Sequence, residues 1–277
     1  MNIGNYTNQL SKSIRYKRYS KNTEESYVYQ IEKFLTNFQN VATKPSEISA
    51  KQIRDYLMNI PNAASHRAAL CAIKYFYKEV GHQARKLDNV EYPHKQQHLP
   101  TVYSQEEMQG LFNACDNLKH KVILSLLYST GLRVSELINL KWADIDRSRM
   151  IISIIQGKGS KDRQVMLTPS LIPLLERYYK EYSPVIYVLN GQFSPKYSES
   201  SVNAVLKHLA VKSGIKKRIY PHLMRHTSFT HMVEAGTDIN LVQRLAGHKS
   251  VKTTGIYLHI SYNRISSIQS PLAGIRI

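Results

Sequence analysis

The sequence predicts a mainly α-helical protein of two domains, with a small β-hairpin in the second domain. Apolar residues recur at helical spacing through residues 1–80, which indicates a compact helical unit. This periodicity fades between Gly81 and Tyr103, where prolines and polar residues are typical of an exposed connection. Two strand-like stretches, Met150 to Ile155 and Gln164 to Leu167, then flank a glycine-bearing turn and predict the hairpin.

Size and composition indicate a protein outside the membrane. The 277 residues are enough for two domains, and a 42% hydrophobic content supplies a core for each. The longest apolar runs, such as Val122 to Leu127, fall far below the roughly 18 residues that a membrane span needs. The first residues lack the apolar stretch of a signal peptide, so we expect a cytoplasmic protein with no membrane partner. Cys71 and Cys115 lie in helical patterns without a CxxC pairing, which favours buried free thiols over a disulfide.

The net charge points to a polyanionic partner. A formal charge of +18 and a pI near 9.8 produce a positive field that concentrates nucleic acids. Charge alone does not identify the partner, because basic proteins also bind ribosomes or anionic membranes, or merely stay soluble. The residues that carry chemistry must therefore decide between these partners.

The first domain is predicted to be a bundle of about four helices. A short basic helix precedes Ser20, and the second helix has glutamates in its first turn. A capping-box pattern at Ser49 and Gln52 starts the third helix. The last helix turns apolar residues to one face and leaves basic residues on another, namely Arg67, Lys74 and Lys78. We therefore assign residues 1–90 to this domain.

A linker over residues 91–103 connects it to the second domain, residues 104–277. Ser104 and Glu107 form the capping box that opens this second domain. Apart from the hairpin, its pattern is helical, and it contains four segments with unusual groupings of basic and polar residues.

The first segment runs from Thr130 to Glu136 and is expected to start a helix, with Arg133 in its first turn. Arg133 and Glu136 lie three residues apart and so share a helix face. A guanidinium in a fixed position can bind two phosphate oxygens, and a neighbouring carboxylate can hold it there. An ordinary surface ion pair is the alternative.

The second segment, Gly157 to Arg163, places three cations at the hairpin tip, Lys158, Lys161 and Arg163, where glycines permit a tight turn. Its spacing differs from that of a Walker P-loop, so nucleotide binding has little support. A lysine such as Lys158 could enter a DNA groove or donate a proton to a leaving oxygen. A solvated basic turn is the alternative.

The third segment, Pro221 to His226, opens a helix, because proline suits a first helical position. His222 and Arg225 then share a face. His222 and His226 have the spacing of a metal pair, but the nearby arginine opposes a cation and no third ligand follows at a suitable spacing. We therefore predict no metal site.

The fourth segment, Leu245 to Tyr257, ends a helix at Gly247, presents His248, and reaches Tyr257 after one further short helix. A tyrosine in a chain that contains 19 of them is ordinarily a packing residue. Because three segments with catalytic residue types precede it, a chemical role for Tyr257 is considered as well.

Taken together and in this order, the four segments resemble the tyrosine recombinase, or phage integrase, family. The family pattern is an arginine, a lysine on a β-hairpin, HxxR, a histidine and a nucleophilic tyrosine. By this resemblance the six active-site positions are Arg133, Lys158, His222, Arg225, His248 and Tyr257. Glu136 and His226 fall on supporting positions. The departures are mild, because Met224, Ala246 and Leu258 replace residues that are frequent in the family without removing a chemical group.

The resemblance implies a site-specific recombinase that joins Tyr257 to a DNA phosphate as a 3′-phosphotyrosine, without metal, ATP or other cofactor. The arginines would stabilise charge on the phosphate, and Lys158 would protonate the departing 5′-oxygen. A free tyrosine has a pKa of about 10, so we expect the electropositive pocket to bring Tyr257 closer to phenolate.

The resemblance also implies a two-domain DNA clamp that acts on double-stranded DNA as a homo-tetramer on two duplexes. Residues 1–90 resemble the family's SAM-like core-binding domain. The tail after Tyr257 resembles the segment that docks on a neighbouring protomer, although docking on its own domain is an alternative. Whether an accessory or partner recombinase is needed stays open. Candidate DNA contacts are Arg15, Lys17, Arg67, Lys74, Lys161 and Arg163.

Three other functions are weighed against this one. A type IB topoisomerase shares the chemistry but does not pair two DNA sites. A DNA-binding protein without catalysis would need no tyrosine or hairpin lysine at these intervals. A metal nuclease would need clustered acidic residues, and the acidic residues here are scattered. The six-residue set therefore favours the recombinase.

Overall fold

The computed structural model describes residues 1–93, 101–155, 162–248 and 250–257. The chain forms two compact units, Met1–Gln97 and His98–Ile277. The division falls inside the segment that the sequence assigns to the linker. Each unit has its own hydrophobic core and is described by itself.

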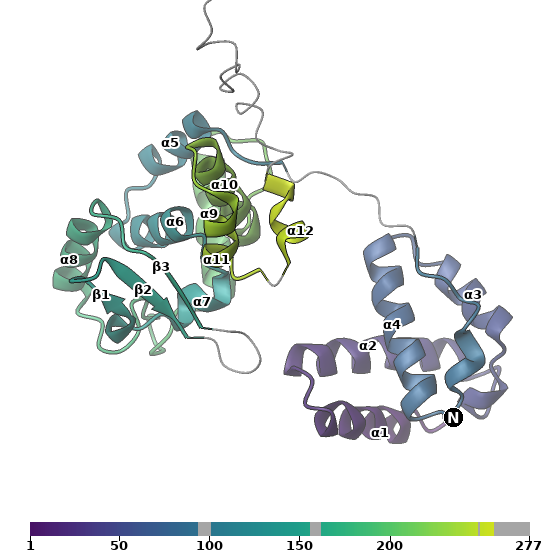
Figure 1. The fold of residues 1–277 in the computed structure, drawn as a ribbon. Coiled ribbons are helices and arrows are strands. Elements are labelled where there is room, and N and C mark those ends of the chain that lie inside the picture. The colour runs from purple at the N-terminus through teal and green to yellow at the C-terminus, as the bar shows by residue number, and fades with distance from the viewer. Residues whose placement is uncertain (94–100, 156–161, 249, 258–277) are drawn as a thin grey trace, which may run out of the picture. The chain divides into compact units, whose positions relative to one another are not determined.

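Four α-helices make up the described part of the first unit (Figure 1), and they are α1 (Ile3–Tyr16), α2 (Lys21–Phe38), α3 (Ala50–Met58) and α4 (Ala63–Glu79). The Ser20 hydroxyl caps α2 by accepting from the Thr23 amide at 3.2 Å. The predicted capping box of α3 is present, because Ser49 and Gln52 exchange hydrogen bonds of 2.8 and 3.2 Å. Helix boundaries in this unit therefore follow local capping chemistry.

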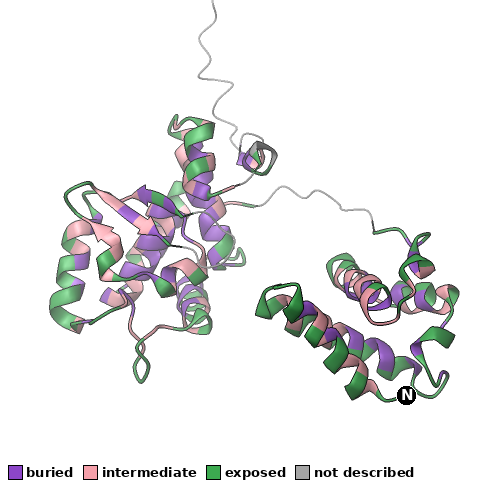
Figure 2. Ribbon diagram, turned by 60° about the horizontal axis from the view of Figure 1, so that its bottom comes forward, coloured by how far each residue is buried: buried purple, intermediate pink, exposed green. Residues whose placement is uncertain are grey.

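The core of the first unit lies where α2 packs on α4. Phe34, Phe76 and Tyr77 are almost fully buried there and meet edge to face. The Tyr77 hydroxyl donates to the Pro45 carbonyl at 2.8 Å, which ties the 3₁₀ turn Pro45–Glu47 onto the bundle. The buried faces of the helices point inward and the exposed faces outward (Figure 2).

The second unit surrounds a buried helix, α6 (Leu118–Thr130). This helix is apolar on almost every side, as expected of a helix enclosed by others. Figure 1 shows α8 and the sheet on one side of α6 and helices α10 to α12 on the other. The remaining helices are α5 (Gln105–Asn113), α7 (Val134–Asn139), α8 (Leu171–Tyr182), α9 (Glu199–Lys212), α10 (Pro221–Glu234), α11 (Ile239–Ala246) and α12 (Val251–Thr254).

A three-stranded antiparallel sheet covers part of this core, with the order β1 (Ile145–Asp146), β2 (Ile151–Ile154) and β3 (Arg163–Met166). The predicted hairpin is confirmed, and its register pairs Ile154 with Arg163. Strand β1 is an addition to the prediction. Two residues are too few to show the alternation that identifies a strand in a sequence.

The segment that enters the second unit is fixed to α10. The Tyr103 amide donates to the Thr227 hydroxyl at 3.2 Å, and the Tyr103 hydroxyl donates to the Arg218 carbonyl at 2.8 Å. His231 lies between the Tyr103 carbonyl, at 2.9 Å from its Nε2, and the Tyr128 hydroxyl, at 2.7 Å from its Nδ1. These bonds tie Tyr103 to α10 at Thr227 and His231 and to the segment just before the helix at Arg218.

The two cysteines are free, with Cys115 buried and Cys71 half-buried. Within the described ranges, no helix combines the length and apolar character needed to cross a membrane.

Candidate active site

Arg133 stands at the junction of α6 and α7. Gly131 ends α6 with a φ of +62°, and Arg133 is the N-cap of α7, one residue before the helical turn in which the sequence placed it. Its amide donates to Oε2 of Glu136 at 2.8 Å, and its Nη1 donates to Oε1 at 2.6 Å. The Arg133 side chain keeps 37% of its surface exposed, so its guanidinium can still reach a ligand.

Arg225 is buried on α10 with only 1% of its surface exposed. It donates from Nη1 to the Gly131 carbonyl at 2.5 Å and from Nη2 to the Ala246 carbonyl. Its guanidinium lies 4.8 Å from the centre of the Phe229 ring. Burial lowers the pKa of Arg225 to about 10, which leaves the side chain charged at neutral pH. The predicted start of α10 at Pro221 is confirmed.

His248 follows directly after the end of α11. Gly247 caps that helix in the left-handed conformation that glycine favours, with a φ of +62°. Gln243 Nε2 donates to the His248 carbonyl at 3.1 Å, and the His248 Nδ1 lies 3.0 Å from the Thr254 hydroxyl. Gln243 on α11 therefore holds the backbone of His248, and Thr254 on α12 holds its imidazole.

Tyr257 is fully buried at the end of the described chain. Its ring lies 5.7 Å from the rings of Phe229 and His226, and it stacks on His248 at 6.3 Å. Among the residues that the structure describes, its hydroxyl has no hydrogen-bond partner. Burial raises the pKa of Tyr257 to about 12, although Arg225 and Arg133 oppose this rise. The expected shift toward phenolate is therefore wrong for this state of the molecule, because desolvation outweighs the two cations.

The histidines of the site are held neutral. Burial, followed by the surrounding cationic groups, lowers the pKa values of His226 and His248 to about 4. Partial desolvation also lowers the pKa of His222, whose ring meets that of His226 edge to face at 4.6 Å. Near neutral pH these imidazoles are uncharged, so they add no positive charge to the site, and each can accept a hydrogen bond.

Arg163 has a different position from the one predicted for it. The sequence places it among the DNA contacts, but its side chain is only 6% exposed. It binds both carboxylate oxygens of Glu136 at 2.7 Å and the Leu245 carbonyl at 2.7 Å. Burial alone would raise the pKa of Glu136, but its bonds to Arg163 and Arg133 lower it to about 2. In this structure Arg163 is therefore bound to Glu136 and Leu245 inside the unit and is not an exposed cation of the hairpin.

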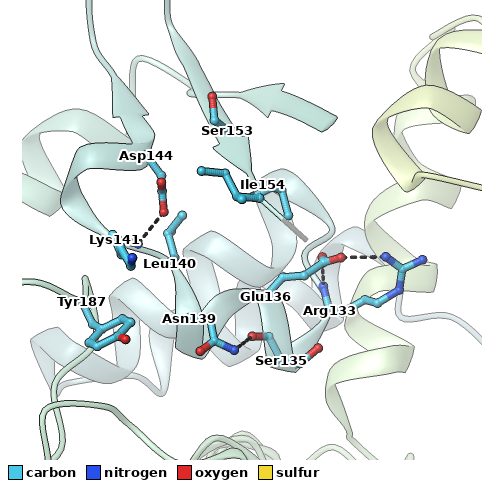
Figure 3. Close-up of a pocket in the computed structure, with 11 residues that line it drawn as sticks. Arg133, Ser135, Glu136, Asn139, Leu140, Lys141, Asp144, Ser153, Ile154 and Tyr187 are labelled. Carbon is cyan, nitrogen blue, oxygen red and sulfur yellow. Dashed lines mark hydrogen bonds and ion pairs between the residues drawn. The ribbon is translucent and has the colours of Figure 1, made fainter. Parts of the chain in front are cut away.

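A polar groove of about 690 Å³ adjoins Arg133. Figure 3 shows that its floor combines α7, with Ser135 and Asn139, and strand β2, with Ser153 and Ile154. Glu136 and Arg133 lie at one end of the groove, and Tyr187 lies toward the other. The groove is thus an open extension of the arginine site.

The four candidate DNA contacts of the first unit have two kinds of partner. Arg15 forms an ion pair with Glu24 at 2.7 Å, and Lys17 forms one with Glu79 at 2.5 Å. Arg67 and Lys74 both lie 4.9 Å from the ring centre of Tyr92.

Lys74 also donates to the Val90 carbonyl at 2.6 Å and is half-buried. Its position fits a tie between α4 and the chain that leaves the unit better than a contact to DNA.

Lys158 and Lys161 lie outside the described residues, as does the tail after Tyr257. The structure therefore brings together five of the six predicted catalytic positions and both supporting ones. Two further contributors were missed by the sequence reasoning. Phe229, which touches both Arg225 and Tyr257, lies one helical turn after Arg225 in the sequence. Thr254 can be identified only in the structure, by its hydrogen bond to His248.

Comparisons with known proteins identify the family of this chain. Residues 101–264 match the phage integrase family model, and residues 7–85 match the model of the N-terminal SAM-like domain of phage integrases. Tyrosine recombinase XerA of Pyrococcus horikoshii is 33% identical over 248 residues, which are 87% of this chain and 84% of that protein. Tyrosine recombinase XerC of Staphylococcus saprophyticus is 30% identical over 270 residues, or 91% of each chain.

Solved structures show the same fold. The crystal structure of a XerA recombinase matches 100% of both chains with 28% identity and a TM-score of 0.58. A lambda integrase dimer bound to a core site covers 91% of this chain and 97% of its own, with 17% identity and a TM-score of 0.75. The family model spans more than half of the chain, and the resemblance drawn from the sequence is confirmed. The chain therefore belongs to the phage integrase family of tyrosine recombinases, a family of site-specific DNA recombination, and is similar to its Xer members.

Proposed function

We propose that this chain cleaves and rejoins DNA strands through a covalent bond between Tyr257 Oη and a DNA phosphate. The observation that carries the proposal is the setting of that hydroxyl. It is buried without a partner among the described residues, beside His248 and within the electrostatic influence of Arg225 and Arg133. A phenylalanine ring could fill the same buried position, so packing alone does not explain the hydroxyl.

The proposed step exchanges one phosphoester for another. Tyr257 Oη attacks the phosphorus, the bond to the 5′-oxygen breaks, and a 3′-phosphotyrosine and a free 5′-hydroxyl result. The new ester keeps the energy of the phosphodiester, so the 5′-hydroxyl of another strand can reverse the step. The balance therefore calls for neither ATP nor a metal ion.

The arginines supply the main electrostatic need. Attack builds negative charge on the non-bridging oxygens, and preorganised cations stabilise that charge without rearranging during the reaction. Two of the Arg225 nitrogens are fixed by backbone carbonyls, which orients the remaining donor directions of the fork. Arg133 is held by Glu136 from one side and is exposed on the other.

The histidines are suited to handle the proton of the tyrosine. His248 uses Nδ1 toward Thr254, which leaves Nε2 for the substrate or for the phenol. A bound phosphate would offset the positive charges that lower its pKa, so proton acceptance becomes easier once DNA is in place. We assign His222 to the phosphate oxygens, because it occupies the exposed start of α10.

Substrate entry requires a local rearrangement. Tyr257 is 0% exposed and Arg225 is 1% exposed, so a phosphate cannot touch both in this state. The short segment from α12 to Tyr257 must shift before attack. DNA binding would thus expose the nucleophile only when a phosphate is present to receive it.

Lys158 completes the proposal as the general acid that protonates the departing 5′-oxygen. An alkoxide is a poor leaving group, so Lys158→Ala should slow cleavage by about 10²- to 10⁴-fold. A substrate with sulfur in place of the bridging 5′-oxygen releases a thiolate, which needs no proton. Cleavage by Lys158→Ala should recover on that substrate, whereas Arg133→Ala should stay slow. Failure of the recovery, with wild-type protein cleaving the sulfur substrate, would reassign Lys158 to a DNA contact and make Lys161 the next candidate.

The wider assembly belongs to the same proposal. The two units would clamp a duplex, with Arg15, Lys17 and Arg67 contacting phosphates, and the affinity would then fall steeply with salt. Four protomers would act on two duplexes, with each tail docked on a neighbour. The exposed side chains of Arg15 and Arg67 on the first unit support such contacts.

Covalent capture from a pool of DNA sequences tests the central step. The protein would be incubated with a library of nicked duplexes of random sequence and then denatured. The DNA that stays attached to it would be sequenced. Wild-type protein is expected to retain DNA with a shared sequence, and Tyr257→Phe none. A recovered site placed on two plasmids then distinguishes recombination from simple relaxation. Retention by Tyr257→Phe would refute the assignment of the nucleophile.

A further inference from the structure

Arg163 links three parts of the second unit that carry predicted catalytic residues. It is the first residue of β3, the strand that follows Lys158 in the sequence. Its fork binds both oxygens of Glu136 on α7 at 2.7 Å, and its Nε binds the Leu245 carbonyl on α11 at 2.7 Å. A single side chain therefore connects the hairpin to the Arg133 segment and to the end of the helix that precedes His248.

Glu136 is shared between two arginines that differ in exposure. Arg133 reaches Oε1 at 2.6 Å and keeps 37% of its side chain exposed, whereas the side chain of Arg163 is 6% exposed. With Arg163 absent, the buried carboxylate would lose a bond to each of its oxygens and would offset more of the charge of Arg133. With Arg163 present, Glu136 orients Arg133 while the group as a whole stays positive.

The end of α11 receives one bond from each buried arginine. Arg163 binds the Leu245 carbonyl, and Arg225 binds the next carbonyl, that of Ala246. The fit at this point is close, because a Cβ on Gly247 would lie 3.0 Å from Cδ of Arg163. Arg163 thus fixes the turn from which His248 projects.

We infer that Arg163 is a positioning residue that orients Arg133, through the carboxylate they share, for its charge-stabilising role at the phosphate. The inference rests on the proposed function of the site. Arginine is required for geometric reasons, since a planar fork binds a carboxylate with two parallel bonds and still has Nε for a third acceptor. Lysine carries the same charge on a single nitrogen and cannot reproduce this pattern.

A methylphosphonate at the cleavage position provides the decisive comparison. This linkage lacks the negative charge on a non-bridging oxygen, so it removes much of the demand for Arg133. Single-turnover cleavage would be measured on a captured DNA site with a phosphodiester and with a methylphosphonate. Arg163→Met should cleave the phosphodiester about 100-fold more slowly than wild type, the scale of a misplaced catalytic group. Arg163→Lys should lie between the two.

The ratio of wild-type to variant rates should shrink on the methylphosphonate for both Arg163 variants, and the same is expected for Arg133→Ala. Adding Arg163→Met to Arg133→Ala should cost much less than it costs the wild type, because the two side chains act as one unit. Leu175→Ala is the matched control, since it weakens the core at α8 away from the site. Its rate ratio should be the same on both linkages.

The two proposals fail in different ways. No covalent product from wild-type protein would refute the proposed function. An active wild type, combined with an Arg163→Met or Arg163→Lys ratio that is equal on both linkages, would refute the positioning role alone. Arg163→Lys keeps the buried charge, so it tests the inference even where Arg163→Met fails to fold.

Discussion

Replacement of Gly131 by alanine tests how tightly the floor of the site is packed. Gly131 ends α6 with a φ of +62°, and a Cβ there would lie 2.5 Å from Cζ of Phe229. The left-handed conformation costs a residue with a Cβ about 1–2 kcal/mol, and overpacking adds about 1–3 kcal/mol. Alanine also reduces the conformational entropy of the unfolded chain, which offsets about 0.4–1 kcal/mol of this loss. The central values of these ranges give a net loss of about 3 kcal/mol.

This loss should lower the melting temperature of the second unit by about 6–12 °C, at about 2–4 °C per kcal/mol for a unit of this size. Gly214→Ala is the control, because Gly214 has a φ of +71° but open space where the Cβ would lie. It should cost at most about 1–2 kcal/mol, the backbone strain alone. Calorimetry of the full chain would measure both variants. Equal losses would show that the Phe229 ring moves freely, and the account of a fixed platform under Arg225 and Tyr257 would be wrong.

Two further predictions concern stability. Tyr257→Phe should melt at the same temperature as wild type or slightly higher, since it removes a buried hydroxyl without a partner among the described residues, a group that costs about 1–3 kcal/mol to desolvate; a clear loss of stability would reveal a hydrogen bond to that hydroxyl. Lowering the pH from 6.5 to 5 should destabilise the second unit, because unfolded histidines bind protons near pH 6.5, whereas His226 and His248 have pKa values of about 4 in the fold. Thermal melts of wild type and of the variant with glutamine at both positions would test this, and identical pH profiles would contradict it.

The sequence predicts the helix ends that carry the site residues better than it predicts the burial and the pKa values of those residues. Capping residues and glycines mark the ends of α6 and α11, so the backbone positions of Arg133 and His248 follow from local chemistry. Pro221 marks the start of α10 in the same way. These signals are local, and one sequence contains them all.

The burial and the pKa values of the site residues depend on packing between residues that are far apart in the sequence. Arg163 looks like one of several hairpin cations, and its burial depends on Glu136 and Leu245, which lie 27 and 82 residues away. The pKa of Tyr257 depends on how much apolar surface covers the ring, which no spacing pattern records. Likewise, Lys74 looks like a surface cation until the chain returns to place Val90 beside it.

Mapping the covalent bond tests the central claim most directly. DNA trapped on wild-type protein would be digested together with the chain, and mass spectrometry would locate the peptide that carries the nucleotide. The chain has 19 tyrosines, so the position is informative. The account predicts a nucleotide joined through its 3′-phosphate to Tyr257 and to no other residue. A nucleotide on a different tyrosine, or on a serine, would contradict it.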